Sequence, residues 1–207
     1  MHTFIRAAIA AAILLTYQVI TYFGSEKFQH DPHNVLTFVD ERIPFVPATS
    51  LIYVLWFPLI AAFPILLYYA DTHIYAVYMS AMFLDITASV IIYLIYPTSF
   101  TRPVPPDTLI GRFMKLIYTG SYRGLNCAPS LHCSSCMLII ICSVTPAAMP
   151  MWIRAVCILV SAGIVISTMT TKQHAFIDFA TAIPMAVLSY AAGCIVPAAF
   201  VVGWIMK

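Results

Sequence analysis

Two histidines, one carboxylate and two basic residues stand in three short strings of an otherwise apolar chain. The strings are Arg102-Pro103, Pro129-Ser130-Leu131-His132, and a segment over 167–178 that contains Lys172, His174 and Asp178. His174 and Asp178 are four residues apart, a spacing that puts two side chains on one face of a helix. A carboxylate beside an imidazole fixes its tautomer and stabilises its protonated form. This pair is therefore a candidate for nucleophilic or acid–base chemistry.

Ser130 stands where an apolar helix is expected to begin. Free backbone N–H groups and the helix dipole make such an N-terminus an anion site, to which a serine hydroxyl adds a donor. His132 follows in the first turn, and Arg102 and Lys172 supply positive charge from two other segments. We therefore expect attack on a phosphate ester. One histidine would act as the nucleophile and the other as the acid, with the cations on the phosphoryl oxygens.

Each of these residues also has a purely structural interpretation. A histidine at a membrane interface is more often a hydrogen-bonded polar group than a catalyst. Arg102 and Lys172 can face lipid phosphates, and Ser130 and Asp178 can simply cap or lead a helix. The catalytic interpretation depends on all six residues falling on one membrane face, at spacings that suit one reaction.

The chain that carries these strings has the composition of a membrane protein. Of its 207 residues 62% are apolar and 9% are charged, against about 45–50% and about 25% in an average soluble domain. The formal charge of +2 excludes a nucleic-acid binder, which needs a basic patch. The hydrophobicity excludes a disordered chain. We expect one membrane-embedded domain over residues 1–207.

Six apolar segments are candidates to cross a bilayer, which takes about 20 residues. They cover residues 4–23, 50–70, 75–96, 130–146, 151–169 and 174–204. Pro58 and Pro64 are expected to bend the second segment, and Pro184 and Pro197 to kink or end the sixth. Asp85 lies near the centre of the third, a costly placement that implies a partner inside the bundle. The predicted fold is all-α, a polytopic bundle of six transmembrane helices.

Six crossings place both termini on one side and the connecting segments 24–49, 97–129 and 170–173 on the other. The middle segment is long, and apolar residues recur in it at helical spacing around Arg112 and Lys115: Leu109, Ile110, Phe113, Met114, Leu116 and Ile117. This pattern predicts a short amphipathic helix in the membrane interface, between the third and fourth crossings. The alternative is a surface loop with incidental apolar residues.

Cys133 and Cys136 form a C-x-x-C string, which suggests metal or redox chemistry. They lie one turn apart in a predicted membrane helix, and the chain has no second pair at zinc spacing. We therefore interpret them as packing residues, with a metal site or a disulfide as the alternative.

Together the three strings resemble the signature of the type 2 phosphatidic acid phosphatase superfamily. Its motifs read K-x6-R-P, P-S-G-H and S-R-x5-H-x3-D. The first is matched at its end by Arg102-Pro103, and the second by Pro129, Ser130 and His132, with Leu131 in place of glycine. The third is matched at full spacing by Ser167, His174 and Asp178.

The resemblance implies a six-helix enzyme that uses neither a metal nor a cofactor. In such enzymes the third-motif histidine attacks phosphorus and forms a phosphohistidine, and the third-motif aspartate orients that histidine. The resemblance therefore implies these roles for His174 and Asp178. His132 would protonate the leaving alkoxide. The phosphoryl oxygens would be held by Arg102, Ser130 and the backbone N–H groups near Leu131. The implied activity is hydrolysis of a lipid phosphate, of the phosphatidic acid or polyprenyl phosphate or pyrophosphate type.

Two cations of the signature are missing. Ile95 stands in place of the first-motif lysine and Thr168 in place of the third-motif arginine. Lys172 is a candidate replacement for one, and Arg123 or Lys115 for the other. The strings N-C-x-P-S-L-H and K-Q-H-x-x-x-D are similar to a branch that includes inositol phosphorylceramide synthases. That likeness implies an alternative reaction, transfer of a phosphoryl headgroup to inositol or another alcohol.

A third hypothesis is a non-enzymatic transporter or scaffold, which Asp85 and the proline-broken helices favour. The side of the active face is also open to two interpretations. The excess of basic residues on the motif side would place that face in the cytoplasm, whereas the family resemblance implies an extracytoplasmic or lumenal face. Because several of those basic residues are proposed phosphate ligands, we favour the extracytoplasmic or lumenal side.

Overall fold

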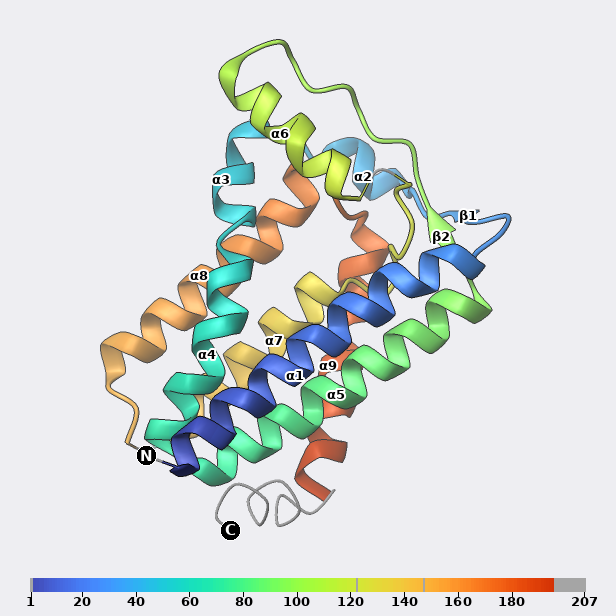
Figure 1. Ribbon diagram of the computed structural model, residues 1–207. Coiled ribbons are helices and arrows are strands. Elements are labelled where there is room, and N and C mark those ends of the chain that lie inside the picture. The colour runs from blue at the N-terminus through green and yellow to red at the C-terminus, as the bar shows by residue number, and fades with distance from the viewer. Residues whose placement is uncertain (1, 122, 147, 196–207) are drawn as a thin grey trace.

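The computed structural model describes residues 2–121, 123–146 and 148–195, which fold mainly into helices (Figure 1). The long helices are α1 (His2–Ser25), α4 (Trp56–Ala70), α5 (Thr72–Ile95), α7 (Leu131–Val144), α8 (Met151–Thr170) and α9 (Phe176–Ile195). Shorter elements connect them: η1 (Glu26–Phe28), β1 (His33–Asn34), α2 (Phe38–Arg42), η2 (Pro47–Thr49), α3 (Ser50–Tyr53), β2 (Thr98–Ser99) and α6 (Leu109–Gly120). The all-α prediction is confirmed, apart from the short parallel pair of β1 and β2.

Five segments of the described chain are long and apolar enough to cross a membrane. They are Thr3–Phe28, Pro47–Ala70, Thr72–Ile95, Met151–Thr170 and Phe176–Ile195. Large apolar side chains such as Ile13, Ile20 and Leu159 are exposed on their outer faces, where a bilayer would cover them. The fourth predicted crossing, α7, has only 14 residues. It is therefore about 21 Å long, against a hydrocarbon core of about 30 Å. The predicted count of six crossings thus stays a prediction.

The second predicted crossing is interrupted, because a turn at Val54 and Leu55 separates α3 from α4. Pro58 has no N–H to donate to the carbonyl of Val54, four residues earlier, so a continuous helix loses a hydrogen bond there. Pro64 lies inside α4 without ending it. The break falls between Tyr53 and Trp56, the two aromatic residues that contact the candidate active site.

The last predicted crossing begins two residues later than expected, because α9 starts at Phe176 and not at His174. Pro184 lies inside α9 and does not end it. The predicted continuation over 196–204, including Pro197, lies outside the described residues.

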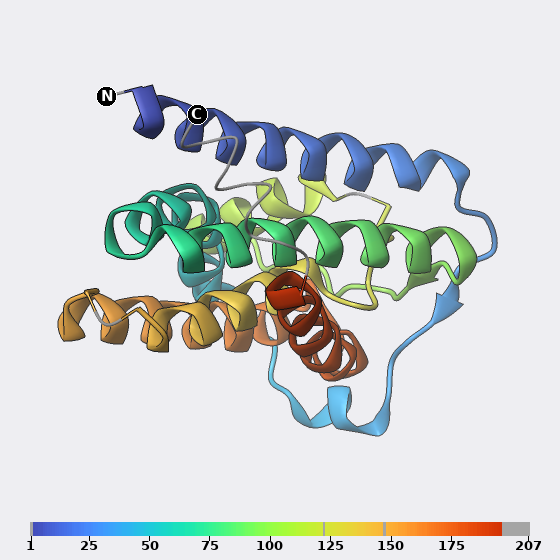
Figure 2. The ribbon, with the colours of Figure 1, turned by 90° about the horizontal axis from the view of Figure 1, so that it is seen from below.

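Helix α7 lies at the centre of the bundle, where it packs against α5, α8 and α9 (Figures 1 and 2). Its residues Leu138 and Ile139 are fully buried. Asp85 of α5 is fully buried as well, and its Oδ2 accepts a hydrogen bond of 2.6 Å from the Ser134 hydroxyl of α7. The polar partner expected for Asp85 inside the bundle is therefore Ser134.

The three connecting segments predicted on one side do lie at one end of the bundle (Figure 1). β1 of the first segment pairs with β2 of the second. Val46 N, in the first, donates to Thr170 O, at the start of the third, at 2.8 Å. Tyr118 of the second donates its hydroxyl to Thr171 O at 2.8 Å. These contacts hold the three connecting segments together at that end.

The amphipathic helix predicted in the long connection is present as α6, which crosses this end of the bundle near α3 (Figure 1). Thr108 caps it by accepting the N–H of Gly111 at 3.1 Å. Met114 points inward and is fully buried, whereas Leu109 and Leu116 are exposed. The position of α6 in a membrane interface stays a prediction.

Candidate active site

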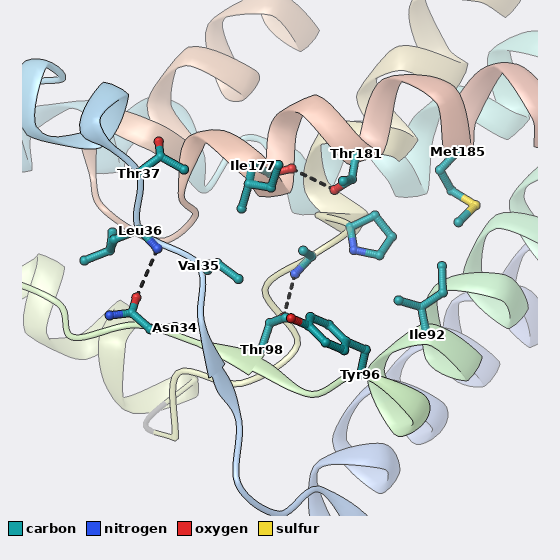
Figure 3. A pocket seen from close by; sticks show the side chains of 12 residues that line it. Asn34, Val35, Leu36, Thr37, Ile92, Tyr96, Thr98, Ile177, Thr181 and Met185 are labelled. Atoms are coloured by element: carbon teal, nitrogen blue, oxygen red, sulfur yellow. Dashed lines mark hydrogen bonds between the residues drawn. The ribbon is translucent and has the colours of Figure 1, made fainter.

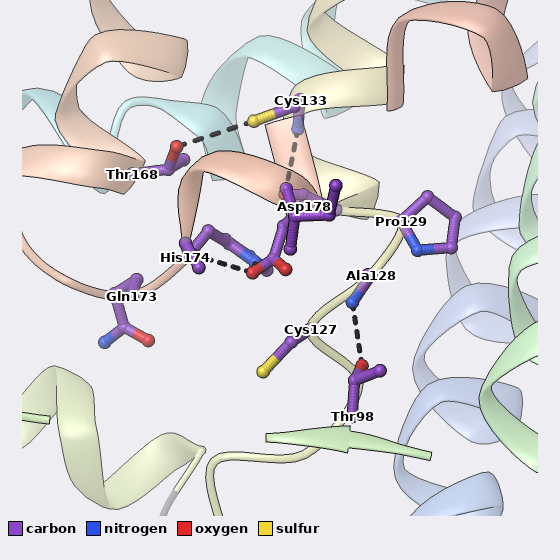
Figure 4. Close-up of polar contacts among 12 residues, drawn as sticks. Thr98, Cys127, Ala128, Pro129, Cys133, Thr168, Gln173, His174 and Asp178 are labelled. Atoms are coloured by element: carbon purple, nitrogen blue, oxygen red, sulfur yellow. Dashed lines mark hydrogen bonds and ion pairs between the residues drawn. The ribbon is translucent and has the colours of Figure 1, made fainter. Parts of the chain in front are cut away.

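His174 and Asp178 are in contact, as their spacing predicted (Figure 4). His174 lies in the turn between α8 and α9 and is 6% exposed, and its Nδ1 is 3.1 Å from Oδ2 of the fully buried Asp178. The same oxygen accepts the N–H of Ala175 at 2.8 Å. Asp178 therefore caps the start of α9 and orients the imidazole with one oxygen. Within the described part of the chain, its Oδ1 has no hydrogen-bond partner.

The backbone before His174 reverses sharply at the end of α8. The N–H groups of Gln173 and His174 both donate to Thr168 O, at 3.0 and 3.1 Å. Lys172 has a φ of 53°, in the left-handed region that non-glycine residues adopt only a few per cent of the time. This conformation closes α8 and lets the chain turn back into α9.

Asp40 of α2 anchors this turn from a distant part of the sequence. Its Oδ1 accepts the N–H of Phe176, the first residue of α9, at 2.7 Å. Its Oδ2 accepts the N–H and the hydroxyl of Thr37, each at 2.8 Å. Lys172 Nζ in turn donates to the carbonyls of Asp40 and Ile43, both at 2.7 Å, and partial burial lowers the pKa of Lys172. The phosphate-binding role of Lys172 stays a prediction, because here its ammonium group bonds to α2.

His132 is the second residue of α7, and its ring contacts three other rings. Its ring centre lies 4.8 Å from that of Tyr53, 4.1 Å from that of Trp56 and 5.5 Å from that of His174. Trp56 Nε1 donates to Ser135 Oγ, one turn further along α7, at 2.8 Å, which fixes the indole. The Nε2 atom of His132 is buried and has no partner among the described residues.

Ser130 caps α7, because its Oγ accepts the N–H of Cys133 at 3.3 Å. Its own N–H donates to the carbonyl of Asp178 at 3.1 Å, which ties the start of α7 to the start of α9. The first N–H groups of a helix, here those of Leu131 and His132, have no intrahelical acceptor. The positive end of the α7 dipole thus lies beside the histidine pair.

Arg102 reaches the same turn through Ser121, at the end of α6. Its Nη1 donates to the carbonyl and the hydroxyl of Ser121, each at 2.9 Å, and its guanidinium lies 5.2 Å from the centre of the Tyr118 ring. Burial raises the pKa of Tyr118 to about 12, so this phenol keeps its proton and donates it to Thr171 O. The Ser121 hydroxyl donates to Gln173 Oε1 at 3.2 Å.

The structure does not bring Arg123 to the histidines. Arg123 is exposed and donates to the carbonyl of Glu26, the first residue of η1. It lines a separate cavity with residues 29–32 and Leu125. Its role as a phosphate ligand, like that of the exposed Lys115 on α6, stays a prediction without a contact to support it.

Two cavities adjoin the site. One, of about 460 Å³, has His132 and Ser121 on its wall and is otherwise mainly apolar, with side chains from α1, α4 and α6 such as Tyr22, Phe57, Ile60, Leu116 and Ile117. The other, of about 730 Å³, is lined by Arg102, Lys172 and residues of the α2 segment.

A third cavity, of about 440 Å³, lies between α5, α9 and the β1 segment (Figure 3). Ile92, Tyr96, Pro129 and Thr181 are among the residues that line that third cavity, and neither His132 nor His174 is on its wall.

The six cysteines are all free, and Cys133 and Cys136 are buried in α7. Cys133 Sγ lies 3.4 Å from Oγ1 of Thr168, the residue that replaces the third-motif arginine (Figure 4). Within residues 2–121, 123–146 and 148–195, no group of three or more His, Cys, Asp or Glu side chains is placed to hold a metal ion.

No protein-family model, curated protein or solved structure matches this chain. The function of the site is therefore inferred from its own side chains.

Five residues at the site were missed by the sequence interpretation: Tyr53, Trp56, Asp40, Ser121 and Gln173. Tyr53 and Trp56 belonged to a segment interpreted as one continuous apolar helix, which carries no sign of a contact with His132. Asp40 and Ser121 lie in connecting segments without a motif. Gln173 alone had a local signal, because it directly precedes His174.

Proposed function

We propose that this protein is a membrane phosphatase that hydrolyses a phosphate ester of a lipid through a phosphohistidine on His174. The observation that carries the proposal is the buried His174 ring, held through Nδ1 by Asp178 and placed 5.5 Å from the ring of a second histidine. This arrangement agrees with the motif resemblance to the type 2 phosphatidic acid phosphatase superfamily.

The hydrogen bond to Asp178 determines which nitrogen of His174 reacts. With the proton on Nδ1 and donated to the carboxylate, Nε2 carries the free electron pair. Attack by Nε2 forms a P–N bond and breaks the bond from phosphorus to the ester oxygen. His132 gives its proton to the departing alkoxide, then takes one from water. The resulting hydroxide breaks the P–N bond and releases inorganic phosphate.

The negative charge of the phosphoryl group would be stabilised from two directions. The N-terminus of α7, with Ser130 as its cap and the N–H groups of Leu131 and His132 as donors, supplies the positive end of a helix dipole. Arg102, which bonds to Ser121 beside the α8–α9 turn, supplies the cation. Both are preorganised donors of the kind that stabilise charge developing on phosphoryl oxygens.

An amphiphilic substrate is supported by the apolar cavity of about 460 Å³ that has His132 on its wall. Its other walls come from α1, α4 and α6, and α1 and α4 belong to segments apolar enough to cross a membrane. A hydrocarbon tail in this cavity would place its alkoxide oxygen beside the histidine that protonates it. Phosphatidic acid and polyprenyl phosphates or pyrophosphates have this shape.

The test is release of inorganic phosphate by the purified full-length protein in detergent, with a panel of lipid phosphates. We expect turnover by the wild type, loss of it in His174→Ala, and no loss in the matched control His73→Ala, which changes an exposed histidine at the start of α5. Consumption of the lipid phosphate that occurs only with inositol or another alcohol, without release of inorganic phosphate, would establish the phosphotransferase alternative. If no lipid phosphate reacts, the catalytic proposal is wrong and a transporter or scaffold is favoured. If His174→Ala is fully active, His174 is not the nucleophile and the proposed mechanism is wrong.

A further inference from the structure

Gln173 holds a buried hydrogen-bond donor that has no partner. Its side chain is 3% exposed, and Nε2 lacks an acceptor among the described residues. A buried donor without a partner is costly, and proteins retain few of them. Such an atom beside a candidate active site points to an acceptor supplied by a ligand.

The orientation of the Gln173 amide follows from its neighbours. A guanidinium group only donates hydrogen bonds, so the Ser121 hydroxyl accepts from Arg102 at 2.9 Å and keeps its own proton to donate. That proton goes to Gln173 Oε1 at 3.2 Å. The chain of bonds from Arg102 through Ser121 to Gln173 leaves Nε2 as the free end of the amide.

A second unpaired donor belongs to the same chain of bonds. Arg102 Nε is buried and has no partner among the described residues, although Nη1 makes two hydrogen bonds. Ser121, which joins Arg102 to Gln173, lines the apolar cavity together with His132. Gln173 itself directly precedes His174, and both side chains leave the same turn (Figure 4). The two unpaired donors therefore belong to one chain of hydrogen bonds that reaches the turn carrying His174.

We propose that Gln173 binds a phosphoryl oxygen of the substrate through Nε2, with Ser121 and Arg102 holding its amide in place. The chemical class of ligand is a phosphate ester or inorganic phosphate. A neutral amide would then supply one of the contacts that cations make in the related signature. Thr168, which replaces the third-motif arginine, is fully buried and bonds to Val165 O, so no cation stands there. This inference rests on the proposed function, since it uses the same phosphoryl site.

Two substitutions separate a ligand role from a structural one. Gln173→Glu keeps an oxygen that accepts from Ser121 but replaces the unpaired donor with a carboxylate oxygen, which repels a phosphate. Gln173→Ala removes both functions. If Nε2 binds phosphate, Gln173→Glu is the more damaging change; if the amide only supports Ser121, Gln173→Glu is the milder one.

The experiment is a calorimetric titration of the full-length protein in detergent with inorganic phosphate, which measures the affinity for phosphate. We expect affinity to fall about 10-fold or more in Gln173→Ala, as for loss of a hydrogen bond to a charged group, and further in Gln173→Glu. Ser121→Ala, which releases the amide without removing its donor, should lose less than Gln173→Ala, and the exposed neighbour Thr119→Ala should match the wild type.

Phosphate affinity in Gln173→Glu equal to or above that of Gln173→Ala would overturn the inference, as would a wild type that binds no phosphate. If Gln173→Ala does not fold, Gln173→Glu against wild type decides, because an unchanged affinity then contradicts the proposal. The failure of the catalytic proposal is a separate result, since it is detected by turnover in His174→Ala and not by phosphate binding.

Discussion

The ring centres of His132 and His174 lie 5.5 Å apart, although the first stands at the start of α7 and the second in the turn before α9. The two helix starts are joined by the bond from Ser130 N to Asp178 O. A nucleophile and an acid held on separate elements at this distance can act on the two sides of one phosphoryl group.

Asp178→Asn should lower kcat by about 10⁴-fold, the size of loss known for replacing an orienting carboxylate by an amide that favours the wrong histidine tautomer. The fold should persist, because an amide oxygen can still accept from Ala175 N. The measurement is phosphate release, with the exposed Asp107→Asn as the matched control. Equal activity of Asp178→Asn and the wild type would show that the carboxylate does not orient a nucleophile.

His132→Phe should slow turnover in a way that depends on the leaving group. The phenyl ring keeps the stack with Tyr53 and Trp56 but carries no proton. Loss of a general acid is expected to cost about 10²- to 10⁴-fold with an alkyl phosphate, and much less with p-nitrophenyl phosphate, whose leaving group needs no proton. Equal losses with both substrates would contradict the role of His132 as the acid.

Asp40→Ala should destabilise the protein and lower its activity together. Removal of the carboxylate leaves the N–H of Phe176 and the donors of Thr37 without acceptors, which should cost about 1–3 kcal/mol of unfolding free energy. Denaturation in detergent and phosphate release measure the two effects. The neighbouring Glu41→Ala, which removes an exposed carboxylate, serves as the control. A stable Asp40→Ala with full activity would mean that α2 does not anchor the turn.

Ile117→Trp should discriminate between substrates with long and short tails. Ile117 lines the apolar cavity of about 460 Å³, and an indole there fills space that a hydrocarbon tail would occupy. We expect kcat/KM to fall for a long-chain lipid phosphate and to stay unchanged for a short-chain one. Leu109→Trp, an exposed position on the same helix, should affect neither. An equal fall for both chain lengths would contradict a tail in this cavity.

The helices of this fold could be predicted from hydropathy and spacing because each is set by a continuous local pattern. The exact positions of a break and of a helix start were not predicted, because their causes lie several residues away along the chain. Because Pro58 has no N–H, the carbonyl of Val54 loses its helical hydrogen bond. The second segment is therefore interrupted on the N-terminal side of the proline. The left-handed φ of Lys172 delays the start of α9 to Phe176, which no hydropathy pattern records.

The candidate site was predictable to the extent that its residues lie in motifs. The contact of His174 with Asp178 follows from their spacing, and Ser130 is the expected cap of α7. The contacts of Arg102 and Lys172 were not predictable, since they depend on where Ser121 and Asp40 lie after folding. A single sequence holds no signal for such pairs between connecting segments.

The central claim is that His174 becomes phosphorylated during turnover, and the most direct measurement is mapping of the labelled enzyme. The protein is mixed with a ³²P-labelled lipid phosphate, quenched at alkaline pH, where a phosphohistidine survives, and analysed by peptide mass spectrometry. We predict acid-labile label on His174 that disappears in His174→Ala and accumulates in variants in which hydrolysis is slowed. Turnover without any label, or label on another residue, would contradict the account.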